Sequence, residues 1–232
     1  MKRSAINALQ REAVAFFQQH HFHLPPWAFW TPDDWWRNRG RAREVVDKKL
    51  GWDLTDFGLG RFREMGLILF TLRNGRPGEA GGKDYCEKVM IAQQEQVTPW
   101  HFHWHKMEDI INRGGGDLVV AVCHATPDEQ LADTPVTVLT DGLLRTVPAQ
   151  GEIVLRPGES ITLPPRMYHQ FHAARGKGAV LIGEVSRVND DDRDNRFLAP
   201  VGRFPTIDED EPVLYYLCTE YPAWLSAETA EH

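Results

Sequence analysis

The chain has 232 residues, of which 42% are hydrophobic and 25% are charged, values that are typical of a folded domain and exclude extended disorder. The formal net charge is -7, and the basic residues are scattered along the chain, which excludes the basic patch of a nucleic-acid-binding protein. We therefore expect a globular protein with no nucleic-acid partner.

The sequence has no feature that predicts secretion or insertion into a membrane. The N-terminus MKRSAINALQ begins with basic residues, but the apolar core of a signal peptide does not follow. No stretch approaches the roughly 20 apolar residues that a transmembrane helix needs. These absences predict a cytoplasmic protein with no membrane partner. The cysteines Cys86, Cys123 and Cys218 form no CxxC pair and are odd in number, so we expect free thiols.

Residues 1–60 are expected to form a mainly helical segment that packs on the rest of the chain. Ser4 can cap a first helix that ends near Gln19, because apolar residues recur at every third or fourth position between them. The prolines in residues 20–40 interrupt helical structure and predict a packed loop or lid. Residues 41–50 are expected to be helical again, until a glycine ends the helix.

Residues 61–232 are expected to form a β-barrel domain that makes one structural unit with the helical segment. Short runs rich in valine, isoleucine and threonine alternate there with clusters of Gly, Pro, Asn and Asp. Short strands without long helices between them are typical of a sandwich or a jelly-roll barrel. The predicted fold is therefore mainly β. The predicted strands are LILFTLR, YCEKVMIAQ, TPWHFHWH, DLVVAVCHA, TPVTVLT, LLRTVPA, EIVLRPG, SITLP, AVLIGEVSR and PVLYYLC.

Four residues have the types and the spacing of a metal site. His101 and His103 lie two residues apart, so on a strand both imidazoles project from the same face. Glu108 follows after a turn, and His169 comes at the end of ITLPPRMYH. Neutral imidazoles and one carboxylate suit Mn²⁺, Fe²⁺, Co²⁺, Ni²⁺ or Zn²⁺, and four protein ligands leave octahedral positions open for a substrate.

These residues match two motifs of the cupin superfamily, which the chain resembles in both halves of the expected barrel. The resemblance implies a jelly-roll barrel with a divalent metal inside. His105 shares the strand face of His103, so the ligand set His103, His105 and Glu108 stays open as an alternative. The first motif matches His101, His103, Glu108 and Gly115, and the second matches Gly158, Pro164 and His169.

A second set of polar residues is expected inside the barrel. On AVLIGEVSR, Glu184 continues an apolar row on the inward face, and an inward carboxylate beside a metal indicates a catalytic base. The alternative is a structural ion pair with Lys88 or Arg187. Asp191 and Arg196, in NDDDRDNRF, are further candidates for the site. Six tryptophans are either core residues or flat walls for a sugar: Trp27, Trp30, Trp35, Trp36, Trp100 and Trp104.

Beyond the cupin motifs, the chain resembles the D-lyxose isomerase family over nearly its whole length. The resemblance rests on WHFHWHKMEDIINRGGG, ITLPPRMYHQFH and GEVSRVNDDDRDNRF, and on the helical segment before the barrel. It implies a cytoplasmic, Mn²⁺-dependent enzyme that interconverts D-lyxose and D-xylulose, often converts D-mannose and D-fructose as well, and is commonly a homodimer.

This chemistry gives each candidate residue a role. An aldose–ketose isomerase moves a proton between C2 and C1 through a cis-enediolate, and Glu184 would carry the proton while a metal polarises the carbonyl. We expect Lys88 to be a second catalytic residue, a positive group beside the sugar oxygens, and Asp191 and Arg196 to bind hydroxyls of the substrate distant from the reacting carbons.

Two other functions stay open for a barrel of this kind. An Fe²⁺-dependent cupin dioxygenase uses a similar metal shell, but it needs no carboxylate base opposite the metal. A non-catalytic sugar-binding cupin would bind its ligand without turnover and would tolerate the loss of Glu184.

Overall fold

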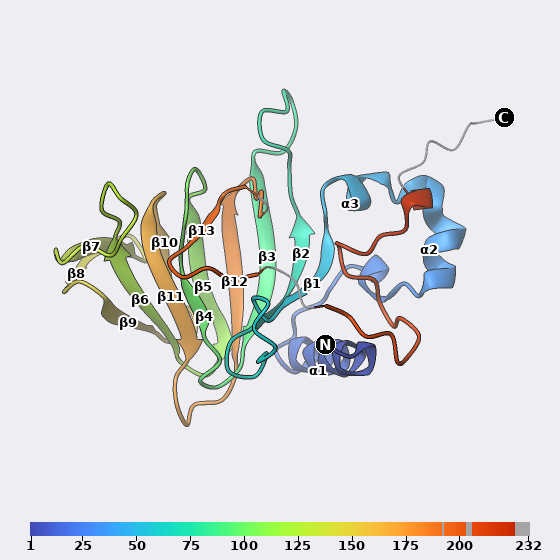
Figure 1. Ribbon diagram of the computed structural model, residues 1–232, viewed down its shortest axis with the longest axis horizontal. Coiled ribbons are helices and arrows are strands. Elements are labelled where there is room, and N and C mark those ends of the chain that lie inside the picture. Colours follow the sequence, from blue (N-terminus) through green and yellow to red (C-terminus); the bar gives the residue numbers. More distant parts are fainter. Residues whose placement is uncertain (192, 203–205, 226–232) are drawn as a thin grey trace.

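The computed structural model describes residues 1–191, 193–202 and 206–225, and within them two antiparallel sheets lie beside a group of helices (Figure 1). The larger sheet has the strand order β1-β2-β3-β12-β5-β10-β7-β8, and the smaller sheet has the order β13-β4-β11-β6-β9. The helices are α1 (Arg3–Gln19), α2 (Pro32–Asn38) and α3 (Arg43–Asp47), with 3-10 turns at Pro26–Phe29, Arg39–Arg41 and Ala223–Leu225. The strands are β1 (Gly51–Thr55), β2 (Leu67–Arg73), β3 (Tyr85–Ala92), β4 (Thr98–His103), β5 (Glu108–Gly115), β6 (Leu118–His124), β7 (Val136–Thr140), β8 (Leu143–Val147), β9 (Gly151–Leu155), β10 (Ser160–Leu163), β11 (Met167–Ala173), β12 (Val180–Arg187) and β13 (Asn195–Phe197).

The main core lies between the inward faces of the two sheets. Strand alternation brings Val120 and Val122 of β6, Ile161 of β10, and Val180 and Ile182 of β12 into this core, where all five are fully buried. Polar residues such as Arg113 of β5, Thr137 of β7 and Glu152 of β9 occupy exposed positions next to buried ones, as expected for antiparallel sheets with one solvated face. The predicted mainly β fold is confirmed.

Helix α1 covers the outer face of the larger sheet at β1, β2 and β3. Its buried residues Ile6 and Phe17 pack in one cluster with Trp52 of β1 and Phe70 of β2, which is the usual way for an amphipathic helix to bury its apolar stripe. Besides its helices, the segment of residues 1–60 contains β1, which pairs with β2. In the described part of the chain, no helix has the length and apolar character needed to cross a bilayer.

The strand predicted at PVLYYLC is wrong, whereas each of the other predicted strands overlaps an observed one, although some were predicted too long. Residues 212–218 form bends and loop, with a single bridge between Leu217 and Trp52. Side chains of α1 satisfy this backbone: the Oδ1 atom of Asn7 accepts the N–H of Leu214 (3.1 Å), and Gln10 donates to the carbonyl of Tyr215 (3.1 Å). These side chains supply the hydrogen-bond partners that a neighbouring strand would otherwise provide.

The first turn of α1 is tied to the C-terminal segment. The side chain of Arg3 is 1% exposed and donates from Nε and Nη2 to Glu209 (2.9 and 2.8 Å) and from Nη1 to Glu220 (3.0 Å). The helix begins at Arg3, so Ser4 lies inside it and is not its cap. The N–H and hydroxyl of Ser4 instead donate to Asp210 (2.9 and 2.8 Å), because the C-terminal segment supplies the acceptor that the helix start needs.

We expect the substitution Arg3→Met to lower the free energy of unfolding by about 1 to 3 kcal/mol, because Glu209 and Glu220 lose their charged donor while the buried stem keeps its packing. Urea denaturation measures this change. The matched control is Arg11→Met on the exposed face of the same helix, for which a change within about 0.5 kcal/mol is expected. Equal losses in both variants would contradict a specific role for Arg3.

Candidate active site

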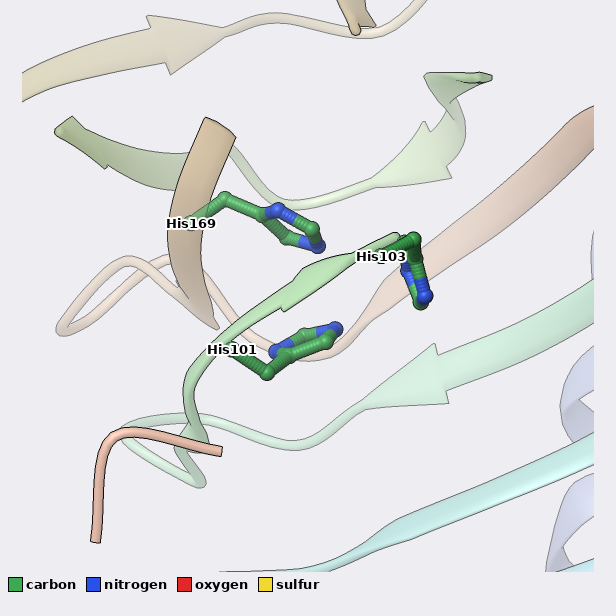
Figure 2. Close-up of side chains that lie close together, drawn as sticks. All are labelled: His101, His103 and His169. Atoms are coloured by element: carbon green, nitrogen blue, oxygen red, sulfur yellow. The ribbon is translucent and has the colours of Figure 1, made fainter. Parts of the chain in front are cut away.

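Three buried histidines form a cluster inside the barrel, where β4 and β11 pair. His101 and His103 come from β4, and His169 of β11 lies directly opposite His101. One candidate ligand nitrogen from each ring lies within 4.8 Å of the other two (Figure 2). The residues are only 8%, 6% and 1% exposed, so a cation between them would be shielded from bulk water. Three buried histidines in this arrangement can bind a metal.

Backbone carbonyls orient two of the three rings. The Nδ1 atom of His101 lies 2.8 Å from the carbonyl oxygen of Pro99, and the Nδ1 atom of His169 lies 3.0 Å from that of Met167. A carbonyl oxygen can only accept, so each Nδ1 carries the proton and donates it. The lone pair is then on Nε2, which is the usual way in which a second hydrogen bond selects the metal-binding nitrogen.

Glu108, the first residue of β5, completes the cluster. Its Oε1 atom lies 3.3 Å from Nε2 of His103 and 3.0 Å from Nε2 of His169. Neighbouring ligands of a metal with bonds of about 2.0–2.2 Å are about 3 Å apart, so these separations suit a common ion. Within the described residues, the buried Nε2 atom of His169 has no hydrogen-bond partner. These donors therefore fit a divalent metal.

The protonation states of the cluster also favour a metal. Burial and the nearby His169 lower the pKa of His101 well below its ordinary value, and burial and Lys106 lower the pKa of His103. Both rings are therefore neutral ligands near pH 7. Burial alone would raise the pKa of Glu108, but the Lys106 ammonium holds it well below the ordinary range, so the carboxylate is charged.

The alternative ligand set with His105 does not come together in the structure. His105 follows the end of β4, is exposed, and is held through its backbone N–H, which donates to Asp194 (2.8 Å). The chain has left the strand at this point, so the two-residue alternation no longer applies. His101 and His103 are the pair that lies beside His169.

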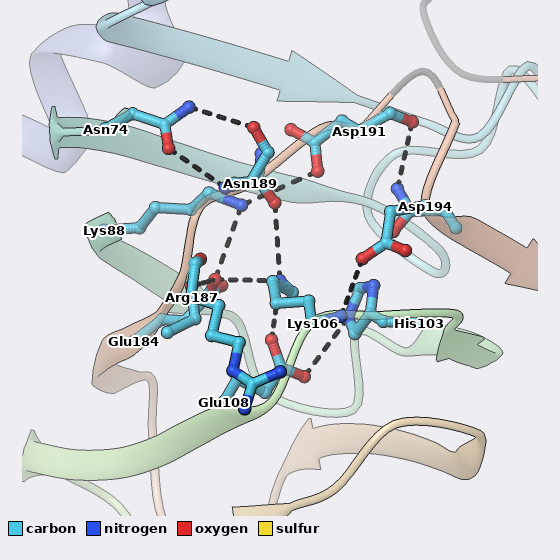
Figure 3. A network of polar contacts seen from close by, with 12 residues as sticks. Asn74, Lys88, His103, Lys106, Glu108, Glu184, Arg187, Asn189, Asp191 and Asp194 are labelled. Atoms are coloured by element: carbon cyan, nitrogen blue, oxygen red, sulfur yellow. Dashed lines mark hydrogen bonds and ion pairs between the residues drawn. The ribbon is translucent and has the colours of Figure 1, made fainter. Parts of the chain in front are cut away.

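Lys106 is a site residue that sequence reasoning missed. It is 3% exposed, and its Nζ atom lies 2.7 Å from Oε2 of Glu108 and 2.9 Å from Oε1 of Glu184 (Figure 3). Both carboxylates raise its pKa despite burial, so the ammonium stays charged. The available signal was its position two residues before Glu108, which would put both side chains on one face of a continued strand.

Glu184, Lys88 and Asp191 are brought together as expected. Glu184 of β12 lies opposite Lys88 of β3 in the sheet, and the Lys88 Nζ atom is 3.5 Å from Oε1 of Glu184 and 3.6 Å from Oδ1 of Asp191 (Figure 3). Burial alone would lower the pKa of Lys88, but Asp191 and Glu184 raise it. The hydroxyl of Ser186 donates to the same Glu184 oxygen (3.1 Å). These contacts give Glu184 a fixed position and compensate its charge.

Arg196 is not brought into this site, which corrects its prediction as a substrate-binding residue. It lies opposite Phe102, a residue of the outer aromatic cluster, and its Nε atom donates to Glu129 (2.6 Å). The inward positions of β13 belong to its neighbours Asn195 and Phe197, both of which line the cavity. The reason is the strand period: a shift of one residue moves a side chain to the other face.

One cavity is lined by most of these groups, although His169 and Arg196 are not among its lining residues, and its flat walls are phenylalanines. Trp27 and Trp35 pack among the helices, and Trp100 and Trp104 pack on the outer side of β4, so tryptophan walls for a sugar are not found among the described lining residues. Strand β1 contributes Asp53 and Thr55 to the polar part. The lining residues are Asp53, Thr55, Phe57, Leu67, Leu69, Lys88, Met90, Thr98, His101, His103, Lys106, Glu108, Ile110, Phe171, Glu184, Asp191, Asn195 and Phe197.

A β-barrel that holds a cluster of three buried histidines beside a carboxylate in its interior defines a cupin-type barrel with a candidate metal centre. A solved structure of Cellulomonas parahominis L-ribose isomerase with L-ribose has the same fold, with a TM-score of 0.60 at 17% identity, covering 90% of this chain and 98% of that one. The L-ribose isomerase of Acinetobacter sp. DL28 is similar, with a TM-score of 0.58 at 15% identity, covering 89% and 98%. These likenesses concern the fold alone.

Sequence similarity identifies the family. A family model described as D-lyxose isomerase matches residues 1–221. The chain is 53% identical over 223 residues to a D-lyxose/D-mannose isomerase of Escherichia coli O157:H7 and 51% identical over 223 residues to one of Serratia proteamaculans, in each case covering 95% of this chain and 98% of the relative. The chain belongs to the D-lyxose isomerase family. The predictions of this family, of a cupin-like fold and of an aldose–ketose isomerase are confirmed.

Proposed function

We propose that the protein interconverts D-lyxose and D-xylulose, and also D-mannose and D-fructose. The names of the two relatives reported above support D-lyxose and D-mannose, and aldose–ketose isomerisation of these two sugars gives D-xylulose and D-fructose. The observation that carries the proposal is a second buried carboxylate, Glu184, which lines the same cavity as His101, His103 and Glu108. Neither the dioxygenase nor the non-catalytic alternative requires it there.

The test is a screen of the purified protein with Mn²⁺ against pentoses and hexoses, with ketose formation as the readout. D-Lyxose and D-mannose are expected to give D-xylulose and D-fructose. Oxygen consumption with Fe²⁺ and no ketose would favour the dioxygenase, and sugar binding without turnover would favour the non-catalytic protein.

We assign the metal to His101, His103, His169 and Glu108, whose donor atoms fit a common ion. When bound, the ion supplies a Lewis acid that polarises the sugar carbonyl and stabilises the negative charge of the enediolate. The family resemblance supports Mn²⁺ as this ion, a homodimeric assembly and a cytoplasmic location, and we propose all three on that basis.

We assign the proton transfer to Glu184. A single carboxylate on one face of the enediolate can take the proton from C2 and return it to C1, which makes one base sufficient for both steps. Lys106 and Ser186 hold one oxygen of Glu184 at 2.9 and 3.1 Å, so the other oxygen is the one that can face the substrate. Because Lys106 binds Glu108 as well, it couples the position of the base to that of the metal ligand.

Lys88 and Asp191 are proposed to hold the sugar oxygens distant from the metal. Lys88 can donate to a hydroxyl or carbonyl oxygen, and Asp191 can accept from a hydroxyl, so the pair can bind both kinds of hydrogen-bonding partner. Apolar residues such as Phe57, Phe171 and Phe197 line the rest of the cavity and can displace water from the sugar face. Fixed binding of this kind makes the proton transfer effectively intramolecular.

Chelation is expected to remove activity, and Mn²⁺ is expected to restore it better than Mg²⁺. The physical reason is that imidazole nitrogens are poor ligands for the harder Mg²⁺ ion, which prefers oxygen. Turnover of D-lyxose after EDTA treatment and titration with each ion measures the difference. Equal rescue by the two ions would count against a centre with three histidine ligands.

A further inference from the structure

The third ring of the cluster lacks the second hydrogen bond that the other two have. His101 and His169 donate from Nδ1 to backbone carbonyls, whereas the buried Nδ1 atom of His103 has no hydrogen-bond partner among the described residues. The Nε2 atom of His103 is the one beside Glu108, at 3.3 Å. If Nε2 binds a metal, Nδ1 carries a proton that is buried and needs an acceptor.

An unused acceptor lies on the neighbouring strand. Asn195 of β13 is directly opposite His103 of β4 in the register, just as Phe197 is opposite His101. Directly opposed residues project from the same face, with Cβ atoms about 4.5–5.5 Å apart. The next pair shows that these side chains meet, because the Phe197 ring stacks on the His101 ring with centroids 5.4 Å apart.

The amide of Asn195 is already oriented to leave its oxygen available. Its Nδ2 atom donates to the carbonyl of Asp191 (3.2 Å), which distinguishes the nitrogen from the oxygen. The Oδ1 atom is buried and, within the described residues, has no hydrogen-bond partner. A buried acceptor without a donor costs about 1–3 kcal/mol. The cluster therefore contains one buried nitrogen and one buried oxygen without partners, on opposed residues of paired strands.

We propose that Asn195 is a positioning residue for the metal ligand His103: its Oδ1 atom accepts the Nδ1–H of His103 when Nε2 binds the ion. This inference rests on the metal assignment made under the proposed function. The structure itself contains no hydrogen bond between the two atoms, so the bond is a property of the metal-loaded protein. Asn195 then fixes the tautomer and the ring orientation of His103, as the carbonyls of Pro99 and Met167 do for the other two rings.

The first test is the affinity of the metal-free full-length protein for Mn²⁺, measured by titration without sugar. In Asn195→Leu, which keeps the size but removes the acceptor, the dissociation constant is expected to rise by about 10- to 100-fold. Asn195→Ala also lacks the acceptor and gives the same readout if the leucine variant does not fold. Asn195→Asp keeps an acceptor oxygen and is expected to bind Mn²⁺ at least as tightly as the wild type.

The matched control is Arg196→Leu, which changes the middle residue of β13 but touches neither the histidine cluster nor the cavity, because Arg196 lies opposite Phe102 and donates to Glu129. Its Mn²⁺ affinity is expected to be unchanged. A loss equal to that of Asn195→Leu would mean that any disturbance of β13 weakens the site, and it would overturn the proposal.

A second test observes the proton itself in the Zn²⁺-loaded protein labelled with ¹⁵N-histidine. A slowly exchanging Nδ1 proton on His103 is expected in the wild type and in Asn195→Asp, and a rapidly exchanging one in Asn195→Leu. Wild-type Mn²⁺ affinity in both Asn195→Leu and Asn195→Ala would overturn the role of Asn195 while leaving the metal centre intact. A wild-type protein that binds neither ion would overturn the metal assignment and this inference with it.

Discussion

The substitution His169→Ala is expected to abolish turnover of D-lyxose and to lower bound metal far below one ion per chain. His169 is 1% exposed and is one of three clustered imidazoles, so its loss removes a proposed ligand from a buried site. The remaining strands still bury the core between the sheets, so circular dichroism and thermal unfolding should show a folded barrel. Metal analysis of the purified variant measures the first effect, and ketose formation measures the second. His103→Ala is expected to act in the same way.

The matched control is His172→Ala, on the same strand but not in the cluster. His172 lies three residues from His169, so strand alternation points the two side chains to opposite faces of the sheet. This variant is expected to retain its metal and its activity. A fully active His169→Ala protein without metal would refute the metal centre.

The substitution Glu184→Gln is expected to lower turnover by about 10²- to 10⁴-fold, the contribution typical of a positioned general base. Glutamine keeps the shape, and its amide oxygen can still accept from Lys106 and Ser186, but it has no basic lone pair for the C2 proton. Metal content and sugar affinity should change far less than turnover, because the four proposed metal ligands are untouched. Incorporation of solvent deuterium at C2 in the same variant reports on proton abstraction directly.

The control for this prediction is Glu87→Gln, on the neighbouring strand β3 at the position opposite Val185. The Glu87 carboxylate is paired with Arg73 and is not among the residues that line the cavity, so its loss should leave turnover nearly unchanged. Near-normal deuterium exchange in Glu184→Gln would place the base elsewhere, and Lys88 or Asp191 would be the next candidates to test.

Strand alternation explains which parts of the site the sequence could predict. His101 and His103 lie on one regular strand, and Glu184 lies on another whose apolar row marks the inward face, so a two-residue period was enough to orient all three. The two-residue alternation no longer predicts the direction of a side chain where the chain leaves a regular strand. Lys106 lies between β4 and β5, outside both strands, so its two-residue spacing from Glu108 was only a weak signal.

Strand alternation was also of little use for predicting the short strand β13. The strand has only three residues, Asn195–Phe197, which are too few for an alternation of apolar and polar residues to show which face is buried. The prediction chose Arg196, whose side chain points to the opposite face from those of its two neighbours. Strand β1 was missed for a different reason. This strand comes directly after the helices in the sequence. Its apolar residues Trp52 and Leu54 pack against α1, and in the sequence they are as compatible with a helix as with a strand.

The contact between Arg3 and Glu220 has a consequence for how the protein is made. The two residues are 217 positions apart, and chains are synthesised from the N-terminus. Helix α1 is therefore made before the strands of both sheets, whereas its polar partners Glu209 and Glu220 are made after them. The Arg3 side chain lacks both carboxylates while the sheets are synthesised, and α1 can complete its attachment only after Glu220 has been added. The docking of residues 209–220 onto α1 is thus expected to follow the synthesis of both sheets.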